Sequence, residues 1–348
     1  MELTKKSLPS AKGDITLVTI TNAAAASVTL SSVGAGIVSL IVPDAAGKMA
    51  DVVMGYANPA DYLYDGPCAG KVPGRFANRI ARGQFSLDGK AYQLAINNGP
   101  NALHGGPEGF QNQIWHTEIV ADNIVRFVYT SPDGEEGYPG KLTATATYEW
   151  TEDNQLKLTL TAVTDAPTVV NLTNHAYFNL AGHNAGSVLD HILQLDAHLY
   201  LPTDSTLVPT GNLDSVAGTP MDFTTPKALG RDIKADFPAL NYGKGYDNCF
   251  VIDGWNPGTL RRAAILTDPR SGRAMEVLTT QPGVQIYTGN WLTGSPAGKD
   301  GYTYSDYDGV AIECQALPDS INKPQFPSVV LRQGREYREI IIFKFINQ

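Results

Sequence analysis

Turn-forming residues at short and even intervals are the feature that most limits the folds open to this chain. Its 34 glycines and 22 prolines are spread along all 348 residues. The chain is therefore interrupted after roughly every ten residues. Helical periodicity is rare, and residues 58–64 and 233–237 have room for a turn or two at most. This spacing predicts many short strands and an all-β fold.

Strand-like segments occur along the whole chain, at residues 15–20, 27–30, 36–42, 124–130, 142–150, 155–162, 168–180, 263–266, 275–279, 284–287, 310–314 and 337–345. Short turns between them favour a large antiparallel β-sandwich or barrel. No linker, charge block or fixed repeat divides the sequence, which indicates one domain over residues 1–348. Long loops at residues 66–82 and 289–308 are predicted to border a cleft at one edge.

The charge and the cysteines exclude several classes of protein. A net charge of -9 and a pI near 5.1 argue against a nucleic-acid partner or an anionic membrane surface. No apolar run has the length of a membrane span or the form of a signal peptide, so a soluble cytoplasmic protein is expected. The three cysteines are widely spaced and are expected to be reduced and buried.

Residues 171–180, NLTNHAYFNL, combine a polar face with a central histidine. A period of two places on one face Asn171, Thr173, His175, Tyr177 and Asn179. Amides, hydroxyls and an imidazole on one face suit a ligand that carries many hydroxyl groups, such as a sugar. The same alternation is also typical of an ordinary solvent-facing strand. Asn174 is the one residue that breaks the pattern.

A second segment, GVAIECQALP at residues 309–318, places Glu313 between Ile312 and Cys314 in an otherwise apolar strand. Burial there is expected to raise the pKa of the carboxyl group and to make it a proton acceptor near neutral pH. Gln315 shares the face of Glu313. The alternative is a glutamate in a structural ion pair.

Aromatic and amide side chains alternate in a third segment, GVQIYTGNWL at residues 283–292. Gln285, Tyr287 and Trp291 there have the composition of a sugar-binding wall, although aromatic residues on strands more often belong to a core. In KVPGRFANRIAR, residues 71–82, Arg79 follows Asn78 and is a candidate hydrogen-bond donor to hydroxyl groups or a carboxylate. It is equally suited to capping the loop.

Among the six histidines, His104 has the strongest local case after His175, because glycines at 99, 105 and 106 allow tight turns around it. The remaining histidines are interpreted as structural. Metal binding is not expected, since no HxH or HExxH spacing occurs. Phosphate-binding GxGxxG or GxxxxGK loops and a GxSxG serine elbow are also missing from the sequence.

Several motifs together resemble the aldose 1-epimerase family, the galactose mutarotases. They occur in the family's order over nearly the whole chain, and jointly they are highly specific: Asn78-Arg79, LHGG around His104, NHAYFNL from Asn174, YDNCF from Tyr246, PGVQIYTGN from Pro282 and ECQALPDSINKPQFPS from Glu313. The resemblance implies a large antiparallel β-sandwich with an open sugar-binding cleft. It also implies a monosaccharide substrate and no cofactor. The sequence does not rank a monomer above a homodimer.

The same resemblance implies roles for individual residues. Glu313 matches the family's general base and His175 its general acid. The matches to sugar-contacting positions are Asn78, Arg79, His104, Asp247 and Gln285, with Tyr177 in the same segment as His175. Asn248 is a departure, because relatives often have histidine after the aspartate, and this puts the neighbouring contacts in doubt.

Anomer conversion explains why an acid and a base are both needed. The base removes the proton of the anomeric hydroxyl while the acid protonates the ring oxygen, so that the ring opens to the aldehyde and closes again on its other face. This requires a protonated imidazole and an ionised glutamate at working pH. Two alternatives remain: a hexose-6-phosphate 1-epimerase, with Arg75, Arg79 and Arg82 as phosphate ligands, and a sugar-binding module without turnover.

Overall fold

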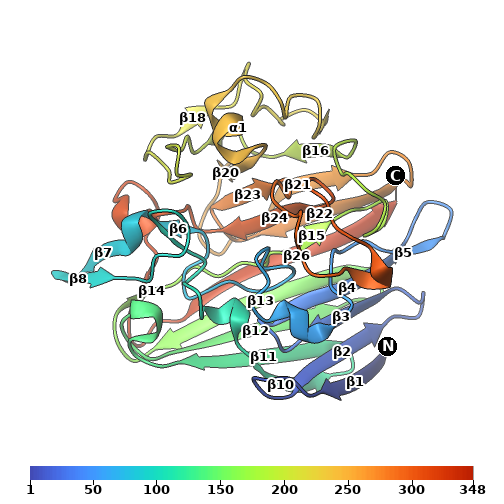
Figure 1. Cartoon of the computed structure of the whole chain (residues 1–348), viewed down its shortest axis with the longest axis horizontal. Coiled ribbons are helices and arrows are strands. Elements are labelled where there is room, and N and C mark those ends of the chain that lie inside the picture. The colour runs from blue at the N-terminus through green and yellow to red at the C-terminus, as the bar shows by residue number, and fades with distance from the viewer. Residues whose placement is uncertain (348) are drawn as a thin grey trace.

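Three antiparallel sheets contain most of the strands of the computed structural model, which describes residues 1–347 (Figure 1). The first sheet has five strands in sequence order: β1 (Glu2–Leu8), β2 (Ile15–Thr21), β3 (Ser27–Ser31), β4 (Gly36–Pro43) and β5 (Met49–Asp51). The second has nine strands, in the spatial order β10 (His116–Ala121), β11 (Ile124–Ser131), β12 (Leu142–Trp150), β13 (Gln155–Thr164), β26 (Tyr337–Asn347), β22 (Arg273–Thr279), β21 (Arg261–Thr267), β16 (Ile192–Leu195) and β19 (Lys227–Ala228).

The third sheet has six strands, in the spatial order β15 (Tyr177–Phe178), β24 (Val310–Gln315), β23 (Gly283–Tyr287), β20 (Asp247–Val251), β17 (Leu199–Tyr200) and β18 (Asp214–Ser215). Of these, β15, β24 and β23 lie in the middle of the molecule in Figure 1, and β18 lies near its top. Three further pairs of strands are β14 (Thr168–Val169) with β25 (Val330–Leu331), β6 (Arg79–Ile80) with β9 (Ala102–Leu103), and β7 (Gln84–Leu87) with β8 (Lys90–Gln93). The predicted all-β antiparallel architecture is thus confirmed.

Helical structure is confined to single turns and one short helix, α1 (Pro238–Gly243). The first predicted turn is present as a 3-10 helix at Pro59–Tyr62, whereas residues 233–237 are not helical. The helix begins at Pro238 instead, because proline at the first helical position has the right φ and needs no hydrogen-bond partner for its nitrogen. Within residues 1–347 the helices are all too short to cross a membrane.

All three sheets contribute residues to the main core. Strand β12 alternates buried and half-buried residues along its nine positions, with Tyr148 and Trp150 on the buried side. From the third sheet, Phe178 packs against Phe343 of β26 with ring centroids 5.1 Å apart. The apolar face of β24, which includes Ile312, joins the same cluster. All six residues of β24 are nevertheless buried, so its other face is covered as well.

Strand register decides which side chains share that other face. Asp247 of β20 pairs with Tyr287 of β23, and Tyr287 pairs with Ala311 of β24. In the same way Gln285 of β23 pairs with Glu313 of β24. Because side chains alternate along each strand, these polar residues all lie opposite the core face. The apolar core therefore fixes the positions of the polar residues above it.

One predicted strand, residues 168–180, is wrong as a continuous element. Only Thr168–Val169 and Tyr177–Phe178 are in strands, and the residues between them are irregular but buried. Their main chain bonds to the loop after residue 69 rather than to a strand neighbour: Asn171 N–H donates to Arg75 O at 3.1 Å, and Ala77 N–H donates to Asn171 O at 2.8 Å. The polar positions are thus not a solvent-facing strand.

Asn174, which broke the predicted alternation, has a structural role in this irregular segment. Its Nδ2 donates to Gly70 O at 2.7 Å and to the Tyr148 hydroxyl at 3.2 Å. Its Oδ1 accepts the main-chain N–H of Ala176 at 3.0 Å. One side-chain amide therefore bonds three buried polar groups. Two of them also have other partners, because Gly70 O accepts from Ile37 N–H at 2.9 Å and the Tyr148 hydroxyl donates to Ala35 O at 2.7 Å.

We expect Asn174→Ala to lower the free energy of unfolding by roughly 2–4 kcal/mol, because it removes three hydrogen bonds between buried groups. Denaturant unfolding followed by tryptophan fluorescence measures the change. Asn184→Ala, at an exposed position, is the matched control and should change stability by less than about 0.5 kcal/mol. Equal stability of the two variants would show that the Asn174 bonds contribute nothing.

Candidate active site

A cleft of about 710 Å³ opens on the polar face of the third sheet. Glu313, His175, Tyr177 and Tyr287 lie among its lining residues. Its walls include parts of both predicted long loops, residues 66–68 and 293–296. The predicted placement of those loops at a cleft is confirmed. The volume lies within the usual range for small-molecule sites, about 300–1,000 Å³.

Glu313 and His175 meet at the bottom of this cleft. Nε2 of His175 lies 3.5 Å from Oε1 of Glu313, and the two residues are 4% and 2% exposed. Within residues 1–347, Oε2 of Glu313 has no hydrogen-bond partner. A buried carboxylate oxygen normally has one, so this atom is available to a ligand that enters the cleft.

The imidazole of His104 stands at right angles to that of His175, with ring centroids 5.3 Å apart. Two reciprocal hydrogen bonds hold this residue. The main-chain N–H of Asn78 donates to the ring Nδ1 of His104 at 3.1 Å, and the main-chain N–H of His104 donates to Asn78 O at 3.1 Å. The φ angles of His104 and Asn78 are positive, at 52° and 65°, and such backbone strain is common at functional sites. At Gly105 a Cβ would lie 1.9 Å from Gly74 O, so only glycine allows this turn.

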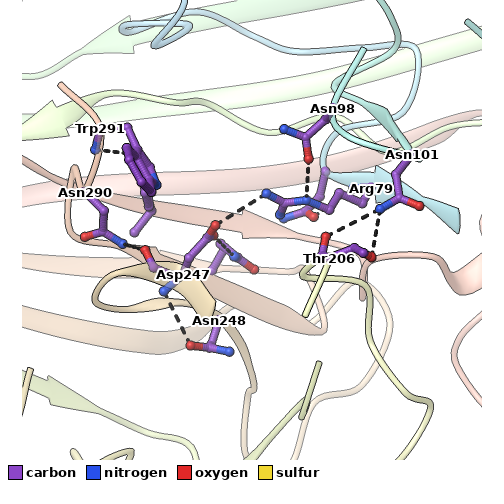
Figure 2. A network of polar contacts seen from close by, with 12 residues as sticks. Arg79, Asn98, Asn101, Thr206, Asp247, Asn248, Asn290 and Trp291 are labelled. Atoms are coloured by element: carbon purple, nitrogen blue, oxygen red, sulfur yellow. Dashed lines mark hydrogen bonds and ion pairs between the residues drawn. The ribbon is translucent and has the colours of Figure 1, made fainter. Parts of the chain in front are cut away.

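A polar network forms another part of the site (Figure 2). The Arg79 guanidinium donates from Nε to Asn98 Oδ1 at 3.0 Å, and its Nη2 lies 3.5 Å from Asp247 Oδ2. Gln285 Nε2 donates to the other Asp247 oxygen at 2.6 Å. Both oxygens of Asp247 are therefore oriented by neighbours before any ligand binds, which reduces the cost of ordering on binding.

Burial dominates the electrostatics of the central pair. Desolvation, with a smaller contribution from the negative charge of Asp247, raises the pKa of Glu313 well above its ordinary value, although Arg79 opposes this. Desolvation also lowers the pKa of His175 to about 4, and Lys71 lowers it further. Desolvation, with smaller contributions from His175, Arg79 and Lys71, lowers the pKa of His104. The predicted rise for Glu313 is confirmed.

Burial does not favour the charge state that the reaction requires. The reaction needs a protonated imidazole and an ionised glutamate, whereas burial disfavours both charged forms. Neutral His175 with protonated Glu313 contains the same number of protons as the charged pair. The two groups thus hold one proton between them over a wide range of pH, and its position is a property of the pair.

His104, His175 and Glu313 also have the composition of a metal site, since one ligand atom from each lies within 4.8 Å of the others. The contact between Asn78 N–H and His104 Nδ1 argues against this use. It makes Nδ1 an acceptor and puts the ring proton on Nε2, which then has no lone pair for a metal. The cluster is better suited to hydrogen bonding with a ligand.

Of four other residues considered in the sequence, two line the cleft and two are buried outside its lining. Tyr177 lines the cleft, and its hydroxyl donates to Pro67 O at 2.9 Å. Trp291, 64% exposed, lines its outer part. Gln285 is buried beside Asp247. Arg75 is buried away from the cleft and donates to main-chain oxygens, including Pro139 O at 2.7 Å.

Sequence reasoning missed several residues around the opening. Asn98 and residues 205–207 line the cleft, as does Tyr242 of α1. Asn101 Nδ2 donates to the Thr206 hydroxyl at 3.0 Å and so ties two of these loops together (Figure 2). The turn-rich sequence NNGPN was visible around Asn98, but no local pattern connects it with residues 205–207, which follow a hundred residues later in the chain.

Comparisons with known proteins agree with this geometry. An aldose 1-epimerase family profile matches residues 16–344. A human galactose mutarotase is 46% identical over 318 residues, which cover 91% of this chain and 90% of the relative. An aldose 1-epimerase from Escherichia coli K12 is 38% identical over 334 residues, or 95% of each chain. An aldose epimerase homologue from C. elegans superposes with a TM-score of 0.88 at 30% identity, over 99% of both chains.

The chain belongs to the aldose 1-epimerase family. Interconversion of aldose anomers is accordingly its activity, and its substrate is a sugar. A galactose 1-epimerase from Lactobacillus acidophilus has the same fold, with a TM-score of 0.86 at 27% identity over 100% of this chain and 99% of that one.

We expect His175 to stay neutral from neutral pH down to about 5, because its folded-state pKa is about 4. His198 is the internal control: the hydrogen bond that its Nδ1–H donates to Asp253 Oδ2 at 2.6 Å raises its pKa above 6.5. NMR titration of the two imidazoles measures the difference, with signals assigned from His→Gln variants. A His175 midpoint near 6.5 would contradict the expected effect of burial.

Proposed function

We propose that this protein interconverts the α and β anomers of free aldohexoses, including galactose and glucose, with Glu313 as general base and His175 as general acid. The observation that carries the proposal is the buried pair at the bottom of the cleft, with His175 Nε2 and Glu313 Oε1 3.5 Å apart. Ring opening needs one group to accept a proton while another donates one, and this pair holds one proton between two groups.

The bound sugar completes the charge separation in this mechanism. The anomeric hydroxyl donates a hydrogen bond to an ionised carboxylate, and the ring oxygen accepts one from a protonated imidazole. Hydrogen bonds to the charged forms favour those forms and oppose the effect of burial. Glu313 then takes the anomeric proton, His175 protonates the ring oxygen, and the C1–O5 bond breaks. After rotation about C1–C2, the same groups act in reverse to close the ring.

The surrounding residues bind the sugar in this proposal. Asp247 accepts from ring hydroxyls, and its two oxygens are oriented by Gln285 and Arg79. His104 donates from Nε2, because its Nδ1 already accepts from Asn78. Tyr177 lines the same floor. Gln285 contributes mainly by holding Asp247, since it is 3% exposed and bonded to that carboxylate.

Two further proposals concern the whole chain. Residues 1–348 act as one domain; in support of this, a single core cluster includes Val18 near one end and Phe345 near the other. The protein works in the cytoplasm, as a monomer or homodimer. Its three cysteines are free and buried, which is typical of proteins from a reducing compartment.

Glu313→Gln should abolish turnover while fold and sugar binding remain, because the amide has nearly the same shape but cannot accept the proton. We expect a loss of at least about a hundredfold in kcat, measured by polarimetry of α-galactose and α-glucose against the buffer rate. Glu339→Gln is the matched control: burial raises the pKa of this carboxyl group too, but it lies outside the cleft lining. Full activity of Glu313→Gln would remove Glu313 from the mechanism.

Glucose 6-phosphate tests the phosphorylated alternative. Among residues 1–347, Arg79 is the only lysine or arginine in the cleft lining, and it already contacts Asn98 and Asp247. We expect kcat/KM for glucose 6-phosphate to be at least about tenfold below that for glucose, because the phosphate would lack a free cation to bind. A higher value for glucose 6-phosphate would show that phosphorylated sugars are the preferred substrates.

A further inference from the structure

An ion pair behind the cleft takes no direct part in the proposed reaction. The side chains of Lys71 and Asp65 are both fully buried, and Lys71 Nζ donates to Asp65 Oδ1. The ammonium group also donates to Tyr62 O at 2.5 Å and to Asn112 Oδ1 at 3.2 Å. All three of its hydrogens therefore have acceptors, as a buried ammonium group requires.

Asp65 is equally well bonded on its second oxygen. Oδ2 accepts the Tyr56 hydroxyl at 2.9 Å and the main-chain N–H of Ala69 at 2.8 Å. Ala69 follows Pro67 and Cys68, which line the cleft. The pair thus fixes both ends of a short loop that forms part of the cleft wall.

The main chain of Lys71 is bonded directly to the segment that carries the proposed acid. His175 N–H donates to Lys71 O at 2.8 Å, and Gly70 N–H donates to His175 O at 2.9 Å. His175 is not part of a regular strand. These two hydrogen bonds replace the strand pairing that would otherwise hold its backbone.

A buried ion pair is a weak source of stability, because the cost of removing two charges from water offsets their attraction. The charge itself therefore needs another explanation. Desolvation is the main cause of the low pKa of His175, and the positive charge of Lys71 lowers this pKa further. The same charge also helps to lower the pKa of His104.

Several titratable groups surround His175, but they differ in whether they carry a charge. They come from the strands and loops packed around the imidazole: Glu313 of β24, Tyr287 of β23, Tyr177 of β15, His104 after β9, and Lys71. Burial raises the pKa values of both tyrosines, so they stay neutral, and His104 is neutral as well. Glu313 shares its proton with His175. Lys71 is thus the permanent positive charge in this group.

We propose that the buried Lys71–Asp65 ion pair is a positioning element of the reaction, which holds the backbone of His175 and keeps a second proton off the catalytic pair. A pair that carried two protons would combine an imidazolium with a neutral carboxylic acid and would have no base. The ammonium charge moves that inactive state to lower pH. This role rests on the proposed function, but the charge state of His175 can be measured without turnover.

The test uses Lys71→Met combined with Asp65→Leu, which removes both charges and leaves neither one buried alone. The matched control is Lys227→Met with Asp232→Leu, because Lys227 is also buried, bonds Asp232 at 3.0 Å, and lies outside the cleft lining. If the first variant does not fold, Lys71→Gln with Asp65→Asn also removes the charges while it keeps hydrogen-bonding groups in place. NMR titration of His175 and the pH dependence of kcat/KM are measured for each.

When the Lys71 charge is removed, we expect the titration midpoint of His175 and the acid limb of the kcat/KM profile to move together to higher pH, by roughly half a pH unit or more. The control should leave both at their wild-type positions. Unchanged midpoints in a folded Lys71 variant would show that the pair is only structural and would overturn the proposal. If the protein fails to convert any anomer, the proposed function is wrong, whereas the NMR midpoint still decides whether Lys71 sets the charge of His175.

Discussion

The site depends on a sheet that is apolar on one face, polar on the other, and covered on both. Packing of the apolar face into the main core, where Phe178 meets Phe343 of β26, fixes the register of β20, β23 and β24. A shift of one residue would turn every side chain over and would bury Glu313 in the core. The hydrophobic core thus determines which polar side chains enter the cleft, although its own residues take no direct part in the proposed reaction.

Desolvation is the second consequence of this arrangement. Because loops cover the polar face, Glu313 and His175 are almost fully buried, and both are shifted toward their neutral forms. The pair is therefore poised between two distributions of one proton. A ligand with a donor at one end and an acceptor at the other favours the charged distribution, and the anomeric centre of a sugar has both groups.

Sequence patterns predicted the regular parts of the fold well and the irregular parts poorly. Strands such as β12, with its strict alternation at residues 142–150, were predicted with their correct limits, because alternation records which side faces a core. Residues 170–176 alternate in the same way except at Asn174, yet they bond to residues 70–77 instead of forming a strand. Glu313 and His175 were found through local context and family motifs. Two contacts were not predicted: the hydrogen bond between Asn101 and Thr206, and the main-chain bond between Lys71 and His175. Contacts between residues far apart in the sequence leave no local pattern.

The bonds between the loop at residues 70–77 and the segment at residues 171–175 have a consequence for folding. They join parts of the chain about a hundred residues apart, and Asp247 and Glu313 enter the site from still later segments. Closing such long loops is slow, and the contacts that reward it form only when the sheets have assembled. The binding cleft is therefore expected to appear late in folding, so a partly folded chain would have much of its core but no place for a sugar.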